Sequence, residues 1–315
     1  MNEQAKYKYV LAIGNFDGLH MGHRALMEEL QKQKALHQAQ SAVITFRPHP
    51  LAVIRGAAPP LLMSDQEKAA FLLDYYGVDD VYFLDFSRDL AQMPPADFLH
   101  ETLLEKYPAG HLVVGFNFTY GREGAGDAAG LERFCQEQQI GLSVIPAVRS
   151  PYGIVSSSAI RQKLAAGDIQ AANEMLGYWY SLKGVVEQGD KRGQRLGWRT
   201  ANISPASDRA LPQNGVYAAR ILWRGELFDG VVNVGRRPTI YDQAGQLLLE
   251  AHLFAKGQPD LYGQELQIFF GAFIRPEKRF DSLASLSAEI HANSEEAKTI
   301  LSRFGPKSHL PKALK

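Results

Sequence analysis

The sequence predicts an α/β domain followed by an all-β domain that ends in a helix. Three observations lead to this fold class. Short apolar runs alternate with amphipathic helical segments in the first half, strands with tight turns fill most of the second half, and helical spacing returns near the end. At 315 residues the chain exceeds what one hydrophobic core usually serves. We therefore expect two domains, 1–179 and 180–315, connected by a short join.

Five apolar runs in the first half are expected to be strands: 9–13, 42–45, 81–84, 112–115 and 143–145. Amphipathic helical segments separate them. One spans 22–38, Ser64 and Glu67 form a capping box that opens another, and Pro94 with Pro95 suits the start of a third. This alternation indicates right-handed crossovers and a parallel sheet, which binds its ligands beyond the carboxyl ends of the strands.

The second half is expected to be antiparallel, with strands at 180–187, 216–223, 226–234, 247–254 and 265–275. In the last of these, alternate apolar residues indicate a half-buried strand, although Phe269 and Phe273 make its second face partly apolar. Either a barrel or a sandwich fits this pattern. Residues 282–304 have helical spacing at Leu283, Leu286 and Ile290 and are expected to form the terminal helix.

Composition favours small-molecule substrates. Lysine plus arginine equals aspartate plus glutamate, 34 of each, and the sequence pI is about 7.1, so the basic excess of a nucleic-acid-binding protein is missing. No apolar signal core or membrane-spanning window is visible, and a cytoplasmic location is expected. The single cysteine, Cys135, excludes an internal disulfide and is expected to pack in a helix. Nothing in the sequence indicates self-association.

The stretch 14–23, Gly-Asn-Phe-Asp-Gly-Leu-His-Met-Gly-His, is the most informative part of the chain. It places His20 and His23 where a strand becomes a helix. Helix N-termini present unpaired N–H groups and partial positive charge, so imidazole donors there suit a phosphate. The alternatives are two ordinary loop histidines or a zinc site, and zinc is disfavoured because no third ligand stands at a helical spacing.

Two other segments of the first half lie at expected loop tips. Residues 114–121 follow a strand and contain Asn117, and residues 156–161 open a helix with Ser157 and Ser158. Serines at a helix start can be plain caps. Arg161, one turn further, instead indicates phosphate binding.

The second half has no P-loop sequence, but residues 189–202 form another candidate phosphate loop. Its three glycines, Gly189, Gly193 and Gly197, stand among four cationic residues, and the alternative is a solvated hairpin. Thr200 and Asn202 are expected on one side of an extended segment, where their neutral oxygens could bind a magnesium ion.

Glu250 is the most informative carboxylate. In 247–254 the odd positions are apolar, which places Glu250 and His252 on the opposite face of the strand. Such a glutamate is either solvated or a positioned general base, and a kinase needs the second.

Residues 14–23 carry the His-x-Gly-His signature of nucleotidyltransferases, and the longer pattern resembles the prokaryotic FAD synthetases, which are bifunctional riboflavin kinase and FMN adenylyltransferase enzymes. The segments around Asn117 and Ser157 resemble motifs of the same family. The resemblance implies a Rossmann-like nucleotidyltransferase domain in which His20, His23, Asn117 and Arg161 act in catalysis. It implies ATP-binding roles for Gly14, Phe16, Asp17, Gly22, Ser157 and Ser158, and a flavin contact for Asn117. Residues 45–50 match the family's Thr-Phe-x-Pro-His-Pro, with Arg47 where an acidic residue is common.

The second half resembles the riboflavin kinase module of that family, a β-barrel, in residues 189–202, 233–239, 261–263 and 273–275. The resemblance implies that Glu250 is the catalytic base, that Thr200 and Asn202 bind Mg²⁺ and ATP, and that Asn233, Thr239 and Arg275 bind the flavin. Gly189, Gly193 and Gly197 would bind ATP. There are departures: Trp198-Arg199 replaces Phe-Pro, and Glu289 and Asn293 stand where Gln and Asp are common.

The resemblance implies that the chain phosphorylates riboflavin to FMN and then adenylylates FMN to FAD, with ATP as co-substrate and Mg²⁺ in both steps. The first alternative, motivated by Arg199, is an FMN adenylyltransferase whose barrel binds flavin without phosphorylating it. The second is a flavin-sensing protein without turnover, and the presence of both sets of site residues argues against it.

Overall fold

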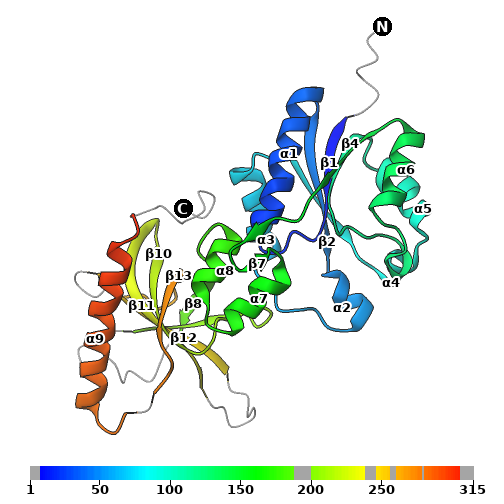
Figure 1. Ribbon diagram of the computed structural model, residues 1–315. Coiled ribbons are helices and arrows are strands. Elements are labelled where there is room, and N and C mark those ends of the chain that lie inside the picture. Colours follow the sequence, from blue (N-terminus) through cyan, green and yellow to red (C-terminus); the bar gives the residue numbers. More distant parts are fainter. Residues whose placement is uncertain (1–7, 188–199, 238–245, 256–259, 279, 306–315) are drawn as a thin grey trace. The chain divides into compact units, whose positions relative to one another are not determined.

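The computed structural model describes residues 8–187, 200–237, 246–255, 260–278 and 280–305. The chain divides into two compact units, Met1–Ser157 and Ser158–Lys315 (Figure 1). Each unit is described by itself below.

The first unit is built on a five-stranded parallel sheet in the order β3-β2-β1-β4-β5. The strand order runs outward from β1 in both directions, so the carboxyl ends of β1 and β4 border the crevice in which such sheets bind ligands. The strands are β1 (Tyr9–Ile13), β2 (Gln40–Arg47), β3 (Asp80–Asp85), β4 (Ala109–Gly115) and β5 (Gly141–Ile145). All five expected strands are confirmed, and the parallel arrangement is confirmed with them.

Helices cover both faces of this sheet. On one face α1 (Met21–His37) buries Leu26, Met27 and Leu30. On the other, η3 (Phe98–Leu104) and α6 (Ala128–Gln138) bury Phe98, Leu103, Leu131 and Phe134 in one core cluster with the strands. The remaining elements are α2 (Pro50–Arg55), α3 (Asp65–Ala70), η2 (Phe71–Tyr75), α4 (Arg88–Gln92), α5 (Pro95–Asp97), η4 (Arg122–Gly124), β6 (Arg149–Ser150) and β7 (Gly153–Ile154).

Local signals in the sequence set several helix ends in this unit. The Ser64–Glu67 capping box is present at the start of α3, with both reciprocal bonds made. Pro95 occupies the first turn of α5, where its missing N–H is not needed. Cys135 is buried in α6, and burial raises the pKa of its thiol to about 11, which agrees with a packing role.

The second unit is a closed six-stranded barrel in the order β10-β11-β12-β9-β8-β13, with β13 pairing back to β10. This closure decides between the barrel and the sandwich in favour of the barrel. The strands are β8 (Ser181–Glu187), β9 (Ala201–Pro205), β10 (Gly215–Trp223), β11 (Glu226–Arg237), β12 (Gln246–Leu253) and β13 (Glu265–Arg275). The helices are α7 (Ser157–Ala165), α8 (Ile169–Leu176) and α9 (Leu283–Ser302), and α9 confirms the expected terminal helix.

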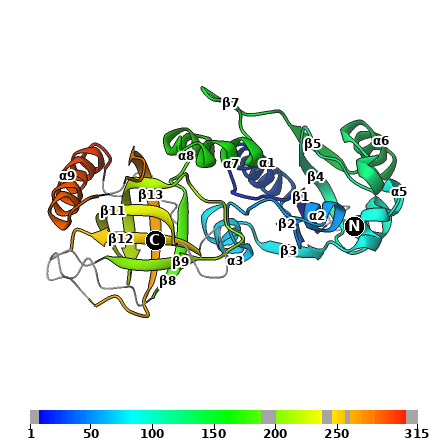
Figure 2. The same ribbon diagram turned by 90° about the horizontal axis from the view of Figure 1, so that it is seen from below.

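Strand β13 is buried on both faces between Leu266 and Ala272, although its sequence indicated a half-buried strand. The reason is that α8 and α9 lie against the outside of the barrel at this strand (Figure 2). Phe269 points into that outer layer, where it packs with Trp179 and Leu301. Phe273, which the sequence placed on the same face, instead contacts the buried Tyr217 ring, because the pairing of β13 with β10 shifts register between the two phenylalanines.

The end of α9 is fastened to the barrel by Arg220 of β10, whose side chain is 3% exposed. Its guanidinium donates to the carbonyl oxygens of Leu301, Phe304 and Gly305, at 3.4, 2.9 and 2.8 Å. The carbonyls at a helix C-terminus lack intrahelical partners and carry partial negative charge, so a buried cation is well placed there.

Helix α8 is fastened to the barrel by one buried amide. The Asn173 side chain accepts a hydrogen bond from the Tyr180 amide at 2.7 Å and donates to the Phe270 carbonyl at 2.8 Å. The division between the two compact units falls after Ser157. The domain boundary expected after residue 179 stays a prediction. Across the described residues, no helix combines the length and the apolar character needed to cross a membrane.

We predict that a fragment starting at Ser158 is more stable than one starting at Tyr178. The shorter fragment lacks Asn173 and leaves two buried backbone groups without their partner, at a cost of about 2 kcal/mol or more in the free energy of unfolding. Urea denaturation of both fragments, followed by circular dichroism, measures the difference. Equal midpoints and slopes would show that α8 contributes nothing to the barrel unit.

Candidate functional sites

His20 and His23 form a stacked pair at the start of α1. His20 is the N-cap residue, and its Nδ1 accepts a hydrogen bond from the His23 amide at 3.3 Å. The two imidazole rings lie nearly parallel, with centroids 3.7 Å apart. Because Nδ1 is an acceptor in this bond, a neutral His20 carries its proton on Nε2.

The glycines of the loop make room for these rings. A Cβ atom on Gly22 would lie 3.1 Å from Cε1 and Nδ1 of His20, and one on Gly14 would lie 3.2 Å from Cζ of Phe16. Phe16 is fully buried with φ +49° and contacts the His23 ring edge-on at a centroid distance of 5.2 Å. The spacing of glycine and histidine therefore reflects ring packing as well as any phosphate contact.

His23 is held in its neutral form. Burial is the largest cause that lowers the pKa of His23 well below its ordinary value, followed by the charges of His20 and Lys68. Its Nδ1 atom is buried and, within the part of the chain that the structure describes, has no hydrogen-bond partner. A buried polar atom of this kind is expected to have a partner, which a bound ligand could supply.

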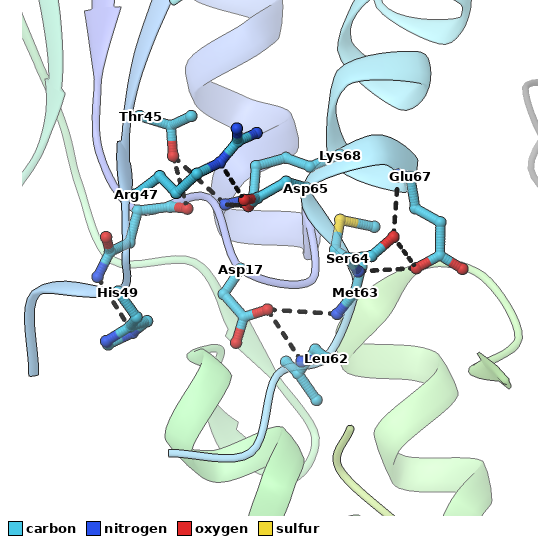
Figure 3. Close-up of polar contacts among 11 residues, drawn as sticks. Asp17, Thr45, Arg47, His49, Leu62, Met63, Ser64, Asp65, Glu67 and Lys68 are labelled. Atoms are coloured by element: carbon cyan, nitrogen blue, oxygen red, sulfur yellow. Dashed lines mark hydrogen bonds and ion pairs between the residues drawn. The ribbon is translucent and has the colours of Figure 1, made fainter. Parts of the chain in front are cut away.

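Asp17 connects this loop by hydrogen bonds to the segment just before α3. Its side chain is 3% exposed, and Oδ1 accepts hydrogen bonds from the amides of Leu62 and Met63 at 2.9 and 3.3 Å (Figure 3). The backbone oxygen of Asp17 accepts from Ser157 Oγ at 2.8 Å, so Ser157 lies against the loop as the sequence suggested. These two amides hold the Asp17 carboxylate, and its expected ATP contact stays a prediction.

The carboxyl end of β2 also reaches the loop. Thr45 Oγ1 donates to the Asn15 carbonyl at 3.0 Å, and the His49 ring lies 3.3 Å from the Asn15 amide. Arg47, the departure from the family pattern, pairs with Asp65 of α3 at 2.7 Å (Figure 3). The positive charge of Arg47 is therefore paired with a carboxylate of α3.

The remaining expected residues of this site fall into two groups. Asn117 is exposed in the segment after β4, at the sheet edge that also carries the loop after β1, because β1 and β4 are neighbours. Ser158 and Arg161 belong to α7 in the second unit, and their approach to the loop stays a prediction.

The barrel brings its expected site residues into one row across neighbouring strands. Strand pairing places Glu250 of β12 directly between Asn202 of β9 and Asn233 of β11. The row continues through Val216 of β10 to Arg275 of β13. The strand neighbours of Asn202, Glu250 and Asn233 are buried in the core, for example Leu249 and Ala251 on either side of Glu250. These three side chains therefore lie on the opposite face of the barrel wall, as the alternation in 247–254 predicted for Glu250.

Asn202 fits a metal or phosphate ligand. Its Oδ1 atom is buried and has no hydrogen-bond partner among the described residues, and Glu250 is its cross-strand neighbour. An amide oxygen beside a carboxylate is a donor set that suits Mg²⁺. Thr200 lies exposed just before β9. Among the described residues, no three His, Cys, Asp or Glu side chains cluster as they would around a metal ion.

Arg275 contacts α9 through two side chains that the sequence had marked as departures. Its Nε atom lies 2.8 Å from Glu289 Oε1 and 3.1 Å from Asn293 Oδ1, one helical turn apart. Lys278 also pairs with Glu289, and this hydrogen bond is the largest cause that lowers the pKa of the Glu289 carboxyl. The sequence alone could not connect residues 275 and 289. Gly189, Gly193, Gly197, Arg199 and Thr239 lie outside the described residues.

Both halves of the chain match known protein families. The family model described as FAD synthetase matches residues 2–159, and that described as riboflavin kinase matches residues 176–301. The chain is 33% identical over 300 residues to a bifunctional riboflavin kinase/FMN adenylyltransferase of Bacillus subtilis, covering 94% of this chain and 92% of the relative. It is 35% identical over 283 residues to the protein of that name in Escherichia coli, covering 89% of each.

A solved structure, described as a macrolide-efflux protein from Streptococcus pneumoniae, matches with a TM-score of 0.85 at 26% identity over 93% of this chain and 94% of the other. Fold, site residues and relatives thus lead to one conclusion. The chain belongs to the family of prokaryotic bifunctional FAD synthetases, the riboflavin kinase/FMN adenylyltransferases.

Proposed function

We propose that the barrel unit phosphorylates riboflavin to FMN and that the parallel-sheet unit transfers an adenylyl group from ATP to FMN, giving FAD and pyrophosphate. The observation that carries the proposal is the row of Asn202, Glu250 and Asn233, because it adds a kinase-type site to a chain that also has the histidine pair. The match of a riboflavin kinase family model to residues 176–301 supports this over a barrel that only binds flavin.

In the adenylyl-transfer step a phosphate oxygen of FMN attacks the α-phosphorus of ATP and pyrophosphate leaves. Negative charge grows on the oxygens around phosphorus and on the leaving group, so fixed donors lower the barrier and no covalent enzyme intermediate is needed. His20 would donate from Nε2, and the neutral His23 would supply a second donor from the first turn of α1. Asn117 and Arg161 would orient the flavin phosphate and the leaving phosphates.

We predict that His20→Asn lowers FAD formation from FMN about a hundredfold, on the order of 3 kcal/mol in the barrier, because one donor is lost at developing charge. Asparagine is a good N-cap residue, so α1 keeps its cap and thermal unfolding should change little. Riboflavin phosphorylation serves as the control within the same protein and should be retained. His23→Ala should behave in the same way. FAD formation at the parental rate by the folded variants would remove the histidines from the mechanism.

In the kinase step Glu250 would accept the proton of the terminal ribityl hydroxyl as that oxygen attacks the γ-phosphorus of ATP, the bond from the γ-phosphorus to the bridging oxygen breaks and ADP leaves. The oxygens of Thr200 and Asn202 would hold Mg²⁺ beside the ATP phosphates, and the ion when bound neutralises phosphate charge. Asn233 lies on the other side of Glu250 and would contact the flavin substrate. Its amide also lies 3.5 Å from Glu277, at the outer limit of a hydrogen bond.

Glu250→Gln is expected to abolish FMN production from riboflavin while leaving conversion of supplied FMN to FAD unchanged. The substitution keeps the size and hydrogen-bonding capacity of the side chain and removes the base. Chromatographic separation of riboflavin, FMN and FAD after incubation with ATP and Mg²⁺ measures both steps. Glu265→Gln, at the exposed start of β13, is the matched control and should keep both activities. If the unmodified protein makes no FMN, the adenylyltransferase-only alternative takes the place of the bifunctional one.

The flavin side of the barrel would depend on Arg275, which Glu289 holds by an ion pair. Asn293 stands one helical turn further along α9 and contacts the same guanidinium nitrogen. Gln and Asp are common in the family at positions 289 and 293, whereas this chain has Glu289 and Asn293. The carboxylate and the amide have therefore exchanged positions, and a negative charge still lies beside Arg275.

We predict that Glu289→Gln raises the KM for riboflavin by about threefold, as expected for loss of a partly exposed ion pair, with kcat little changed. The double variant Glu289→Gln/Asn293→Asp returns the carboxylate to the neighbouring turn and should restore the KM. Glu295→Gln removes a carboxylate from the same helix that pairs with Lys298 instead, and it should have no effect. An unchanged KM in the first variant, or no recovery in the second, would contradict the exchange.

The substrates implied are riboflavin, FMN and ATP, with ATP used in both steps. The lack of a nucleic-acid partner is proposed because lysine plus arginine equals aspartate plus glutamate. A cytoplasmic location stays part of the proposal as well.

A further inference from the structure

Lys68 is a buried lysine that the sequence patterns did not mark. It lies on α3 and is 6% exposed, which is rare for lysine because removing its charge from water is costly. Burial is the largest cause that lowers the pKa of its ammonium group, and the carboxylates of Asp65 and Asp17 oppose this effect. A position of this kind calls for strong compensating contacts.

The contacts that Lys68 makes are long. Its Nζ atom lies 3.4 Å from Thr45 Oγ1, 3.6 Å from Asp65 Oδ1 and 5.8 Å from the centre of the Phe83 ring. Charge-assisted hydrogen bonds are usually 2.7–2.9 Å. Asp65 is also shared, because Arg47 approaches its other oxygen at 2.7 Å. The distance from the ammonium group to each of these three partners is therefore near the longest at which such an interaction is counted.

Lys68 is linked to the loop of residues 14–23 through Thr45. The hydroxyl that it contacts, Thr45 Oγ1, donates in turn to the carbonyl of Asn15 in the segment after β1 (Figure 3). The segment that leads into α3 is bonded to Asp17 of the same loop. The Lys68 charge is one of the causes of the low pKa of His23. The contact with Thr45 therefore places this cation beside the loop that carries the histidine pair.

We propose that Lys68 binds a phosphoryl oxygen of a substrate in the adenylyl-transfer site. The inference rests on the proposed function of the parallel-sheet unit and adds a cation to it. Both substrates of that step carry phosphate, ATP in its triphosphate and FMN on its ribityl chain. An ammonium group that is already desolvated attracts a phosphate more strongly than an exposed one, and a phosphate oxygen would supply the short contact that the protein does not.

The test compares Lys68→Met, which keeps the length of the side chain without its charge, with Lys68→Arg, which keeps the charge. Conversion of FMN to FAD by the unmodified enzyme is measured first, so that failure of the proposed function is seen separately. The KM values for ATP and FMN are then determined, together with inhibition of this step by pyrophosphate, adenosine and lumiflavin. Lys34→Met, which removes an ion pair with Asp79 in the same unit, controls for loss of a paired lysine.

We expect Lys68→Met to weaken one set of phosphate-bearing ligands by roughly tenfold or more, in line with loss of a charge-assisted hydrogen bond. If ATP supplies the phosphate, the KM for ATP and inhibition by pyrophosphate change while inhibition by adenosine does not. If FMN supplies it, the KM for FMN changes while inhibition by lumiflavin does not. Lys68→Arg should retain part of the affinity. Two results overturn the proposal: parental constants for all ligands, or equal weakening of adenosine with ATP and of lumiflavin with FMN, as misfolding would cause.

Discussion

Hydrogen-bond register between neighbouring strands is the constraint on which both sites depend. In the barrel, Glu250 stands opposite Asn202 on one side and Asn233 on the other because β12 pairs with β9 and β11 in that register. Side chains alternate along a strand, so a slip of one residue would turn Glu250 into the core and bring Leu249 or Ala251 out. The buried apolar neighbours therefore hold the polar row in place.

In the parallel sheet the same constraint acts at the strand ends. Pairing of β1 with β2 and β4 brings the loop after Ile13, the Thr45 hydroxyl and the segment around Asn117 to a single edge. Thr45 then bonds the loop directly. A site made of three chain segments thus needs only the register of three strands to assemble, together with the helix that follows β1.

Much of this could be predicted from the sequence, because the responsible signals are local. Alternation along 247–254 placed Glu250 and His252 together, and the Ser64–Glu67 spacing gave the start of α3. What could not be predicted depends on packing between distant segments. Phe269 blurred the alternation of β13 because α9, some twenty residues later, covers it. The sequence pattern shows Lys68 only as one polar residue of a helix, because its contact with Thr45 forms when the chain folds. Arg47 and Glu289 read as departures until their partners, Asp65 and Arg275, were adjacent in space.

The two units differ in how they treat buried charge. In the parallel-sheet unit His23 is kept neutral by burial, and Lys68 is buried with contacts of 3.4 Å to Thr45 and 3.6 Å to Asp65. In the barrel unit Arg220 is buried with its donors on the Asp229 carboxylate and on three carbonyl oxygens at the end of α9. Arg220 therefore has several protein acceptors, whereas a ligand phosphate is proposed as the close partner of Lys68.

The anchoring of α9 by Arg220 makes the last described turn of the chain part of the barrel's core. The same helix presents Glu289 and Asn293 to Arg275. Removing the carbonyls of Leu301 to Gly305 would leave the buried Arg220 guanidinium with Asp229 as its remaining acceptor and would weaken the packing of α9 on the barrel. A truncation that reaches this turn is therefore expected to disturb the Arg275 contacts and the kinase unit before it affects adenylyl transfer.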